Sequence, residues 1–240
     1  MLELAVVVFL FLSCAAGVLI GSIPFGYLTG RFVLKDDIRS YGSGNIGATN
    51  VGRVLGWKWG ILVLLLDAFK GLIATLGAAY GAAGMMTIPG GWVNHAAVIA
   101  GLGSIMGHMY PVYLRLRGGK GVATALGVVI VLAPRALGVA LIVFVVVLFF
   151  SRRIALASML AAVAFGAAWV LMAGDKAWTM SESSLTAFAI IVPLLIIWRH
   201  RSNIERLLSG TESEFTAPVK PAVGQDSSSA STRSAETDDA

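Results

Sequence analysis

Long runs of apolar residues divide this chain, and they constrain its fold more than any other feature. The clearest runs cover roughly 4–28, 57–83, 93–114, 154–173 and 185–198. A helix needs about 20 apolar residues to cross the hydrocarbon core of a membrane. Only 13% of the residues are charged, against roughly a quarter in soluble domains, because ionised side chains are costly inside a bilayer. The sequence therefore predicts an all-α polytopic membrane bundle.

A further apolar stretch, 122–150, is interrupted by Pro134 and Arg135. Proline lacks the amide donor that an α-helix interior requires, so it breaks the helix there. We expect two short helices, at about 122–132 and 136–150, which tilt or lie where the bilayer is thin. The prediction is then about seven membrane helices, two of them short.

The distribution of Lys and Arg predicts the orientation of these helices. Basic residues cluster in 31–58, 115–120, 152–153 and 199–206. Loops rich in Lys and Arg stay on the cytoplasmic side. All four clusters share that side only if 122–150 forms a hairpin, which places the N-terminus outside and the C-terminus in the cytoplasm. The net charge of +5 is attributed to this effect, so we expect no nucleic-acid partner.

Two parts of the chain differ in composition. Residues 1–215 are predicted to form the membrane domain, and 216–240, rich in Ser, Ala and Asp, to form a disordered cytoplasmic tail. The first run is preceded by Glu3 and by no Lys or Arg, unlike a signal peptide, so we expect it to remain as a span. The single Cys14 excludes a disulfide framework. Carboxylates and histidines are dispersed, so neither a metal nor a cofactor is expected.

The first polar segment, SYGSGNIGATNVGR, combines glycines with neutral donors and one arginine. Its candidates are Ser43, Asn45, Thr49, Asn50 and Arg53. Glycines allow a backbone to approach a ligand closely, and successive amides can form an anion-binding nest. A guanidinium suits a phosphate. The alternative is an ordinary Gly/Asn-rich turn.

The second polar segment contains Gly118, Gly119, Lys120 and Gly121, immediately before an apolar helix. Free amides at a helix N-terminus, together with a lysine, are typical of anion sites. The segment is not a P-loop, because a glycine follows the lysine where that motif has Ser or Thr. The alternative is a flexible loop whose lysine only sets orientation.

The third segment, HRSNIERLLSGTE, contains His200, Asn203 and Glu212. If it is helical, His200 and Asn203 share a face. The alternative for His200 is an interfacial side chain just past a span.

Ionisable residues also lie inside the apolar runs. Asp67 and Lys70 are three residues apart and can pair within one helix. Residues of this kind at membrane depth are functional candidates, but a purely structural pair is an equal alternative. The role of His108 stays open, and His95 is expected to be interfacial.

Taken together, GSGNIGATNVGR, GGKGVAT and HRSNIERLLSGTE, with GSIPFGYLTGR and DAFKG, resemble the bacterial acyl-phosphate-dependent glycerol-3-phosphate acyltransferases, the PlsY type. The resemblance runs from about residue 18 to 214. It implies transfer of a fatty acyl group from acyl phosphate to the 1-hydroxyl of glycerol 3-phosphate, which gives lysophosphatidic acid and phosphate, at the bacterial inner membrane. It also implies a functional link to a soluble enzyme that forms acyl phosphate.

The resemblance assigns roles by position. Ser43 and Arg53 are expected to be essential, and residues 118–121 to cradle the phosphate of glycerol 3-phosphate. His200 and Asn203 would orient the substrates, and Glu212 would hold the fold.

The residues themselves show no convincing Ser-His-Asp set and no His-x4-Asp pair. Acyl phosphate has a good leaving group, so positioning and charge stabilisation can supply much of the rate. We therefore hypothesise that a substrate phosphate accepts the proton.

Two other functions fit the composition. A transporter for a phosphorylated solute would place its polar residues near the midplane, usually within internal repeats, and the motif at 43–53 has no repeat in the second half. A non-catalytic scaffold leaves the three phosphate-suited segments without a purpose.

Overall fold

The computed structural model describes residues 2–85 and 88–215. Within these ranges the chain is all-helical, as predicted, with no strand. The predicted tail, 216–240, lies outside the described residues. The α-helices are α1 (Leu2–Gly21), α2 (Phe25–Val33), α3 (Ala48–Leu55), α4 (Trp57–Gly84), α5 (Val93–Met109), α6 (Val122–Leu132), α7 (Pro134–Ser151), α8 (Ile154–Ala173), α9 (Ser183–Arg199) and α10 (Arg201–Leu208).

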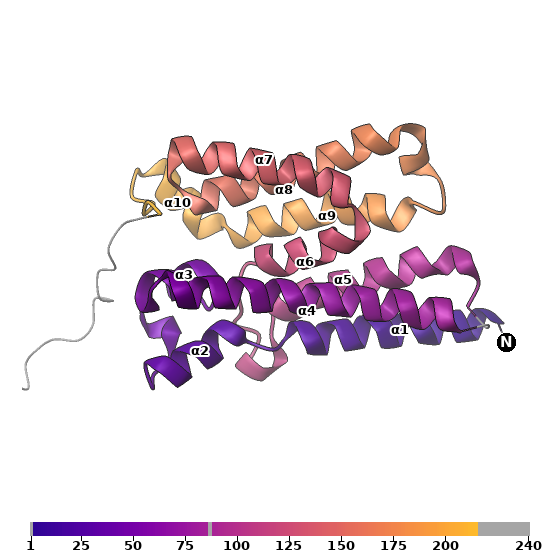
Figure 1. The fold of residues 1–240 in the computed structure, drawn as a ribbon, viewed down its shortest axis with the longest axis horizontal. Coiled ribbons are helices and arrows are strands. Elements are labelled where there is room, and N and C mark those ends of the chain that lie inside the picture. Colours follow the sequence, from indigo (N-terminus) through magenta and orange to yellow (C-terminus); the bar gives the residue numbers. More distant parts are fainter. Residues whose placement is uncertain (1, 86–87, 216–240) are drawn as a thin grey trace, which may run out of the picture.

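The long helices form two groups that lie side by side (Figure 1). One group contains α1, α4 and α5, and the other contains α7, α8 and α9. The short α6 lies between the groups and packs against α4, α5, α7 and α9. The short helices α2, α3 and α10 gather at the end of the bundle opposite the N-terminus (Figure 1). The polar segments therefore converge at one end.

Each of the predicted apolar segments contains a helix, with some different bounds. The break at Pro134 is confirmed, but α7 begins at Pro134 because proline suits the first position of a helix. At 18 residues α7 is long enough to cross a membrane, so the prediction of two short helices is confirmed for α6 and was wrong for α7. The first run is not one helix, because the chain breaks at 22–24 between α1 and α2. The third ends at Met109, just before Pro111.

Five helical stretches are long and apolar enough to cross a membrane, and α9 with α10, bent by 59°, would make a sixth. The helix α6 is too short at 11 residues. The five are Leu2–Val33, Trp57–Gly84, Gly90–Leu114, Pro134–Ser151 and Ile154–Trp178.

Glycines bring α1 and α5 into close contact. Gly17 and Gly21 on α1 and Gly103 and Gly107 on α5 are each spaced by four residues, which places each pair on one helix face. A Cβ at Gly107 would overlap the carbonyl oxygen of Val18. Small residues of this spacing allow helix backbones to pack closely where apolar solvent supplies no hydrophobic driving force.

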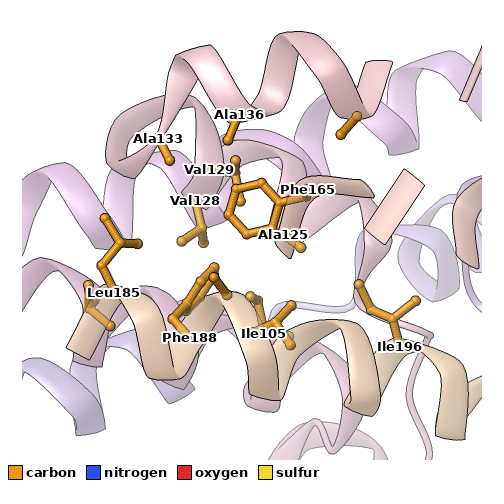
Figure 2. Packing of buried hydrophobic residues seen from close by; sticks show 14 of the residues in the cluster. Ile105, Ala125, Val128, Val129, Ala133, Ala136, Phe165, Leu185, Phe188 and Ile196 are labelled. Carbon is orange, nitrogen blue, oxygen red and sulfur yellow. The ribbon is translucent and has the colours of Figure 1, made fainter. Parts of the chain in front are cut away.

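The largest apolar core joins α5, α6, α7, α8 and α9 (Figure 2). The rings of Phe165 and Phe188 meet edge to face at 6.3 Å, and Val128 is fully buried. This core fixes α6, so it fixes the polar segment that precedes α6.

The close contact between α1 and α5 predicts that Gly107→Ala lowers the free energy of unfolding by about 1–3 kcal/mol, because the new methyl group must displace a backbone carbonyl. Gly138→Ala on α7 is the matched control, since a Cβ at Gly138 meets nothing within 4 Å. Unfolding of both variants in detergent measures the difference. Equal stabilities of the two variants would show that α1 and α5 can move apart at no cost in free energy.

Candidate active site

A polar cavity of about 150 Å³ lies among the three polar segments. It brings together most of the predicted site residues, from positions up to 169 residues apart. Gly118, Gly119 and Lys70 do not line it. The predicted residues that line it are Ser43, Asn45, Thr49, Asn50, Arg53, Asp67, Lys120, Gly121, His200, Asn203 and Glu212.

The first polar segment is shaped by the buried side chain of Asn50. Its Oδ1 accepts hydrogen bonds from the backbone N–H and the hydroxyl of Ser43, at 2.8 and 3.2 Å. Its Nδ2 donates to the carbonyls of Tyr41 and Asn45, at 3.1 and 2.8 Å. The amide of Asn50 is thus used within the chain, and it holds Ser43 at the cavity.

Part of the first polar segment is the helix α3, where the sequence predicted no helix. Val51, Val54 and Leu55 lie on one face and pack with buried Ile38 and Ile46. This spacing of three and four residues is that of an amphipathic helix. The helix α3 carries Thr49, Asn50 and Arg53 to the cavity wall.

Arg53 connects the cavity to the C-terminal part of the described chain. Its Nη2 donates to the carbonyls of Ser213 and Glu214, at 3.1 and 3.3 Å. The ring of Phe215 stacks on Trp57 at 4.4 Å between centroids. Burial lowers the pKa of Arg53 from its ordinary value, yet a guanidinium stays charged at any physiological pH.

The Gly-Gly-Lys-Gly segment is held from both groups of helices. The N–H of Gly119 donates to the carbonyl of His108 on α5, at 3.0 Å. From α9, Arg199 donates to the carbonyl of Gly118 at 3.0 Å and to that of Gly119 at 2.9 Å. The Gly119 amide is used in this way, whereas the amides of the first turn of α6 have no intrahelical acceptor and are free for a ligand.

Arg199 was not among the predicted site residues. The only signal in the sequence was its place in the basic cluster beside His200. A basic residue at the end of a span has orientation as its ordinary explanation, so its contact with a loop 80 residues earlier could not be inferred.

Lys120 begins a chain of polar contacts. Its Nζ donates to Oδ1 of Asn203. Nδ2 of Asn203 donates to Oε1 of Glu212 at 2.7 Å, and Nε of Arg206 donates to Oε2 of Glu212 at 2.7 Å. Glu212 therefore orients Asn203, and Asn203 orients the ammonium group.

Burial lowers the pKa of Lys120 to about 8, with attraction by Glu212 opposing the shift and repulsion by Arg206, Arg53 and Arg199 adding to it. Lys120 and Arg53 line the cavity, Arg199 and Arg206 lie nearby, and the carboxylates that line it, Asp67 and Glu212, are already paired. The cavity is suited to an anion.

His200 occupies the bend between α9 and α10 and is 3% exposed. Its Nδ1 lies 2.8 Å from the carbonyl oxygen of Ile196. A carbonyl can only accept, so Nδ1 carries a proton. The neutral ring then has a lone pair on Nε2.

Asp67 and Lys70 form the predicted pair, with Oδ1 and Nζ 2.7 Å apart and both side chains 2% exposed. His108 joins them, which the sequence did not predict, because only the packing of α4 on α5 brings it near. Its Nδ1 lies 2.9 Å from Lys70 Nζ and 3.4 Å from Asp67 Oδ1.

An apolar cavity of about 270 Å³ adjoins the polar one. Leu64, Val122, Ala123, Phe144 and Ser158 line both, so the two form one continuous site. Residues of α6, α7, α8 and α9 line the apolar part. Along α6 it extends from position 122 to 129, about 10 Å at the rise of an α-helix.

No group of three His, Cys, Asp or Glu side chains in 2–85 and 88–215 is arranged to hold a metal ion.

The family model described as glycerol-3-phosphate acyltransferase matches residues 11–210. Among curated relatives, the glycerol-3-phosphate acyltransferase of Myxococcus xanthus (strain DK1622) is 45% identical over 199 residues, which are 83% of this chain and 96% of the relative. The protein of that name from Thermoanaerobacter pseudethanolicus (strain ATCC 33223 / 39E) is 41% identical over 204 residues, 85% of this chain and 94% of the relative.

Two crystal structures of PlsY, an integral membrane glycerol 3-phosphate acyltransferase, are similar to this chain. The glycerol 3-phosphate form has a TM-score of 0.74 and the lysophosphatidic acid form 0.71. In both, the sequences are 38% identical, and the similarity covers 85% of this chain and 94% of the other.

The contacts of Glu212 predict that Glu212→Gln lowers the free energy of unfolding by about 1–3 kcal/mol, because a charge-assisted bond to Arg206 is lost inside a buried network. Glu205→Gln, on the exposed side of α10, is the matched control and should change little. Chemical or thermal unfolding in detergent compares them. If both variants behaved alike, the network would not support this end of the fold.

Proposed function

The chain belongs to the glycerol-3-phosphate acyltransferase family, and from this premise we propose that it transfers a fatty acyl group from acyl phosphate to the 1-hydroxyl of sn-glycerol 3-phosphate. The products are lysophosphatidic acid and phosphate, in the first acylation of phospholipid synthesis. The observation that carries the proposal is the continuous site, cationic at one end and apolar along the other. Relatives of the same name and the ligand forms of PlsY support it.

The phosphate of glycerol 3-phosphate is placed at the first turn of α6. Amides there have no intrahelical partner and favour an anion. Lys120 and Arg53, which line the same cavity, supply positive charge. Asn45 and Thr49 line it as well and offer neutral hydrogen-bonding groups.

The acyl chain of the donor is placed in the apolar cavity between α6, α7, α8 and α9. Burial of apolar surface there favours a lipid chain. The acyl phosphate group then lies at the shared boundary, near Val122 and Ser158, where a second phosphate meets the basic side chains.

In the proposed reaction, the 1-hydroxyl oxygen of glycerol 3-phosphate attacks the carbonyl carbon of acyl phosphate. The new C–O ester bond forms, the C–O bond to phosphate breaks, and inorganic phosphate leaves. Phosphate is a good leaving group, so positioning and charge stabilisation suffice for much of the rate. The hydroxyl proton passes to a substrate phosphate, while Ser43, His200 and Asn203 orient the substrates.

We place the site on the cytoplasmic face of the bacterial inner membrane. In this proposal the chain has seven membrane helices, of which the short α6 lies where the bilayer is thin, with the N-terminus outside and the C-terminus inside. The gathering of α2, α3 and α10 at one end supports it, because the predicted cytoplasmic segments meet there (Figure 1). A soluble enzyme that forms acyl phosphate would reach the site from that side. The transporter alternative is less well supported, since transporter sites usually lie at the midplane.

The function is tested with purified protein in detergent, given acyl phosphate and glycerol 3-phosphate. We expect lysophosphatidic acid and phosphate in equal amounts. Ser43→Ala should lower turnover about 100-fold, because the hydroxyl at the cavity is lost. Ser202→Ala, exposed on α10, is the control. Solute flux in liposomes without acyl transfer would favour a transporter instead.

The lowered pKa of Lys120 predicts a pH dependence. Below about pH 8 its ammonium is charged and attracts phosphate, and above that pH the charge is lost. We therefore expect kcat/KM for glycerol 3-phosphate, which reports ionisations of the free enzyme, to fall as pH rises through about 8.

Lys120→Arg should move this fall to higher pH, because a guanidinium keeps its charge. Lys58→Arg, at an exposed position, is the matched control and should keep the original profile. A profile that is the same for all three proteins would remove Lys120 from phosphate binding.

A further inference from the structure

His108 has one ring nitrogen that no described residue uses. The side chain is 4% exposed and lines the polar cavity from the last turn of α5. Nδ1 contacts Lys70 and Asp67. Nε2 makes no hydrogen bond within 2–85 and 88–215. It is not fully buried, because it keeps some exposure to solvent. Nε2 is therefore the ring nitrogen left for a ligand in the cavity that His108 lines.

Lys70 determines which ring nitrogen carries the proton. Its Nζ has three close partners: Asp67 Oδ1 at 2.7 Å, the carbonyl of Ile23 at 2.9 Å and His108 Nδ1 at 2.9 Å. An ammonium group has three protons and no lone pair, so each contact requires an acceptor. Nδ1 of His108 accepts, and the neutral ring carries its proton on Nε2.

This assignment of the proton excludes a role of His108 as a general base. A general base oriented by a carboxylate would need Nδ1–H donated to Asp67, with the lone pair on Nε2. Asp67 Oδ1 is 3.4 Å from Nδ1, and the Lys70 ammonium is closer at 2.9 Å. The side facing the cavity is thus a donor and not a base.

We propose that His108 Nε2–H donates a hydrogen bond to a phosphate oxygen of a substrate bound in the polar cavity. The inference rests on the proposed function, since it takes the ligand to be a phosphate. Asp67 and Lys70 are positioning residues, because they fix the ring and its proton. Gly119 belongs to the same arrangement: a Cβ there would overlap Nε2 of His108.

The proposed donor complements the cations around it. The charges of Asp67 and Lys70 cancel one another. The neutral ring of His108 therefore adds a directed hydrogen bond without adding net charge. Lys120 and Arg53 supply the attraction, and the ring fixes where one oxygen lies. That oxygen can belong to glycerol 3-phosphate or to the acyl phosphate, and steady-state kinetics separate the two.

The first test compares His108→Met, which has no donor, with His108→Gln, whose amide offers an acceptor to Lys70 and a donor to the cavity. We expect His108→Met to raise KM about 10-fold to 100-fold for the substrate whose phosphate is bound, and His108→Gln to recover most of the loss. A rise of KM for glycerol 3-phosphate alone, or for acyl phosphate alone, identifies the substrate whose phosphate His108 binds. An unchanged KM in His108→Met would overturn the proposal. So would an equal rise of KM in His108→Met and His108→Gln, if both variants melt at the same temperature as the parent protein.

The second test does not depend on turnover. Nitrogen-15 NMR of histidine-labelled protein, assigned by loss of the signal in His108→Gln, reports the tautomer. We expect a protonated Nε2 that shifts when inorganic phosphate is added. A protonated Nδ1, or no shift in a protein that is active, overturns the proposal while the function stands. A protein that shows the shift but transfers no acyl group would contradict the proposed function alone.

Discussion

The rest of the site depends on the hydrogen bonds that hold the Gly-Gly-Lys-Gly segment. Arg199 reaches from α9 to the carbonyls of Gly118 and Gly119, and the backbone carbonyl of His108 on α5 accepts from the N–H of Gly119. These contacts join the two groups of helices at one short loop. They also determine where α6 begins and where Lys120 lies. Without them, the basic side chains and the amides of α6 would not face one cavity.

The membrane explains why polar groups are concentrated in this way. Backbone and charged groups inside a bilayer must find partners within the protein, so the chain confines them to one end and to a few buried networks. The polar cavity is bounded by one such network, from Lys120 through Asn203 and Glu212 to Arg206. Beside it, α6 to α9 leave an apolar cavity. A lipid-linked donor and a water-soluble acceptor can therefore meet at the boundary between the two.

Much of this arrangement could be predicted from the sequence, because apolar periodicity and Pro134 indicate the helices and three polar motifs indicate the site. The family resemblance is confirmed. The helix α3 was missed because its few apolar residues, around Val51, stand among glycines and polar residues, and only their packing on Ile38 and Ile46 shows that they form a buried face. Arg199 was missed, and the role of His108 stayed open, for another reason: their partners are 80 and 38 residues away, and no local pattern encodes such contacts.

The most direct test of the central claim is a distance measurement by solid-state NMR, between the phosphorus of bound glycerol 3-phosphate and the nitrogen-15 of Lys120 Nζ in lipid bilayers. The account predicts strong phosphorus–nitrogen dipolar coupling, as direct contact requires, together with coupling to the amide nitrogens of the first turn of α6. Binding with no coupling to either group would place the phosphate elsewhere and contradict the account.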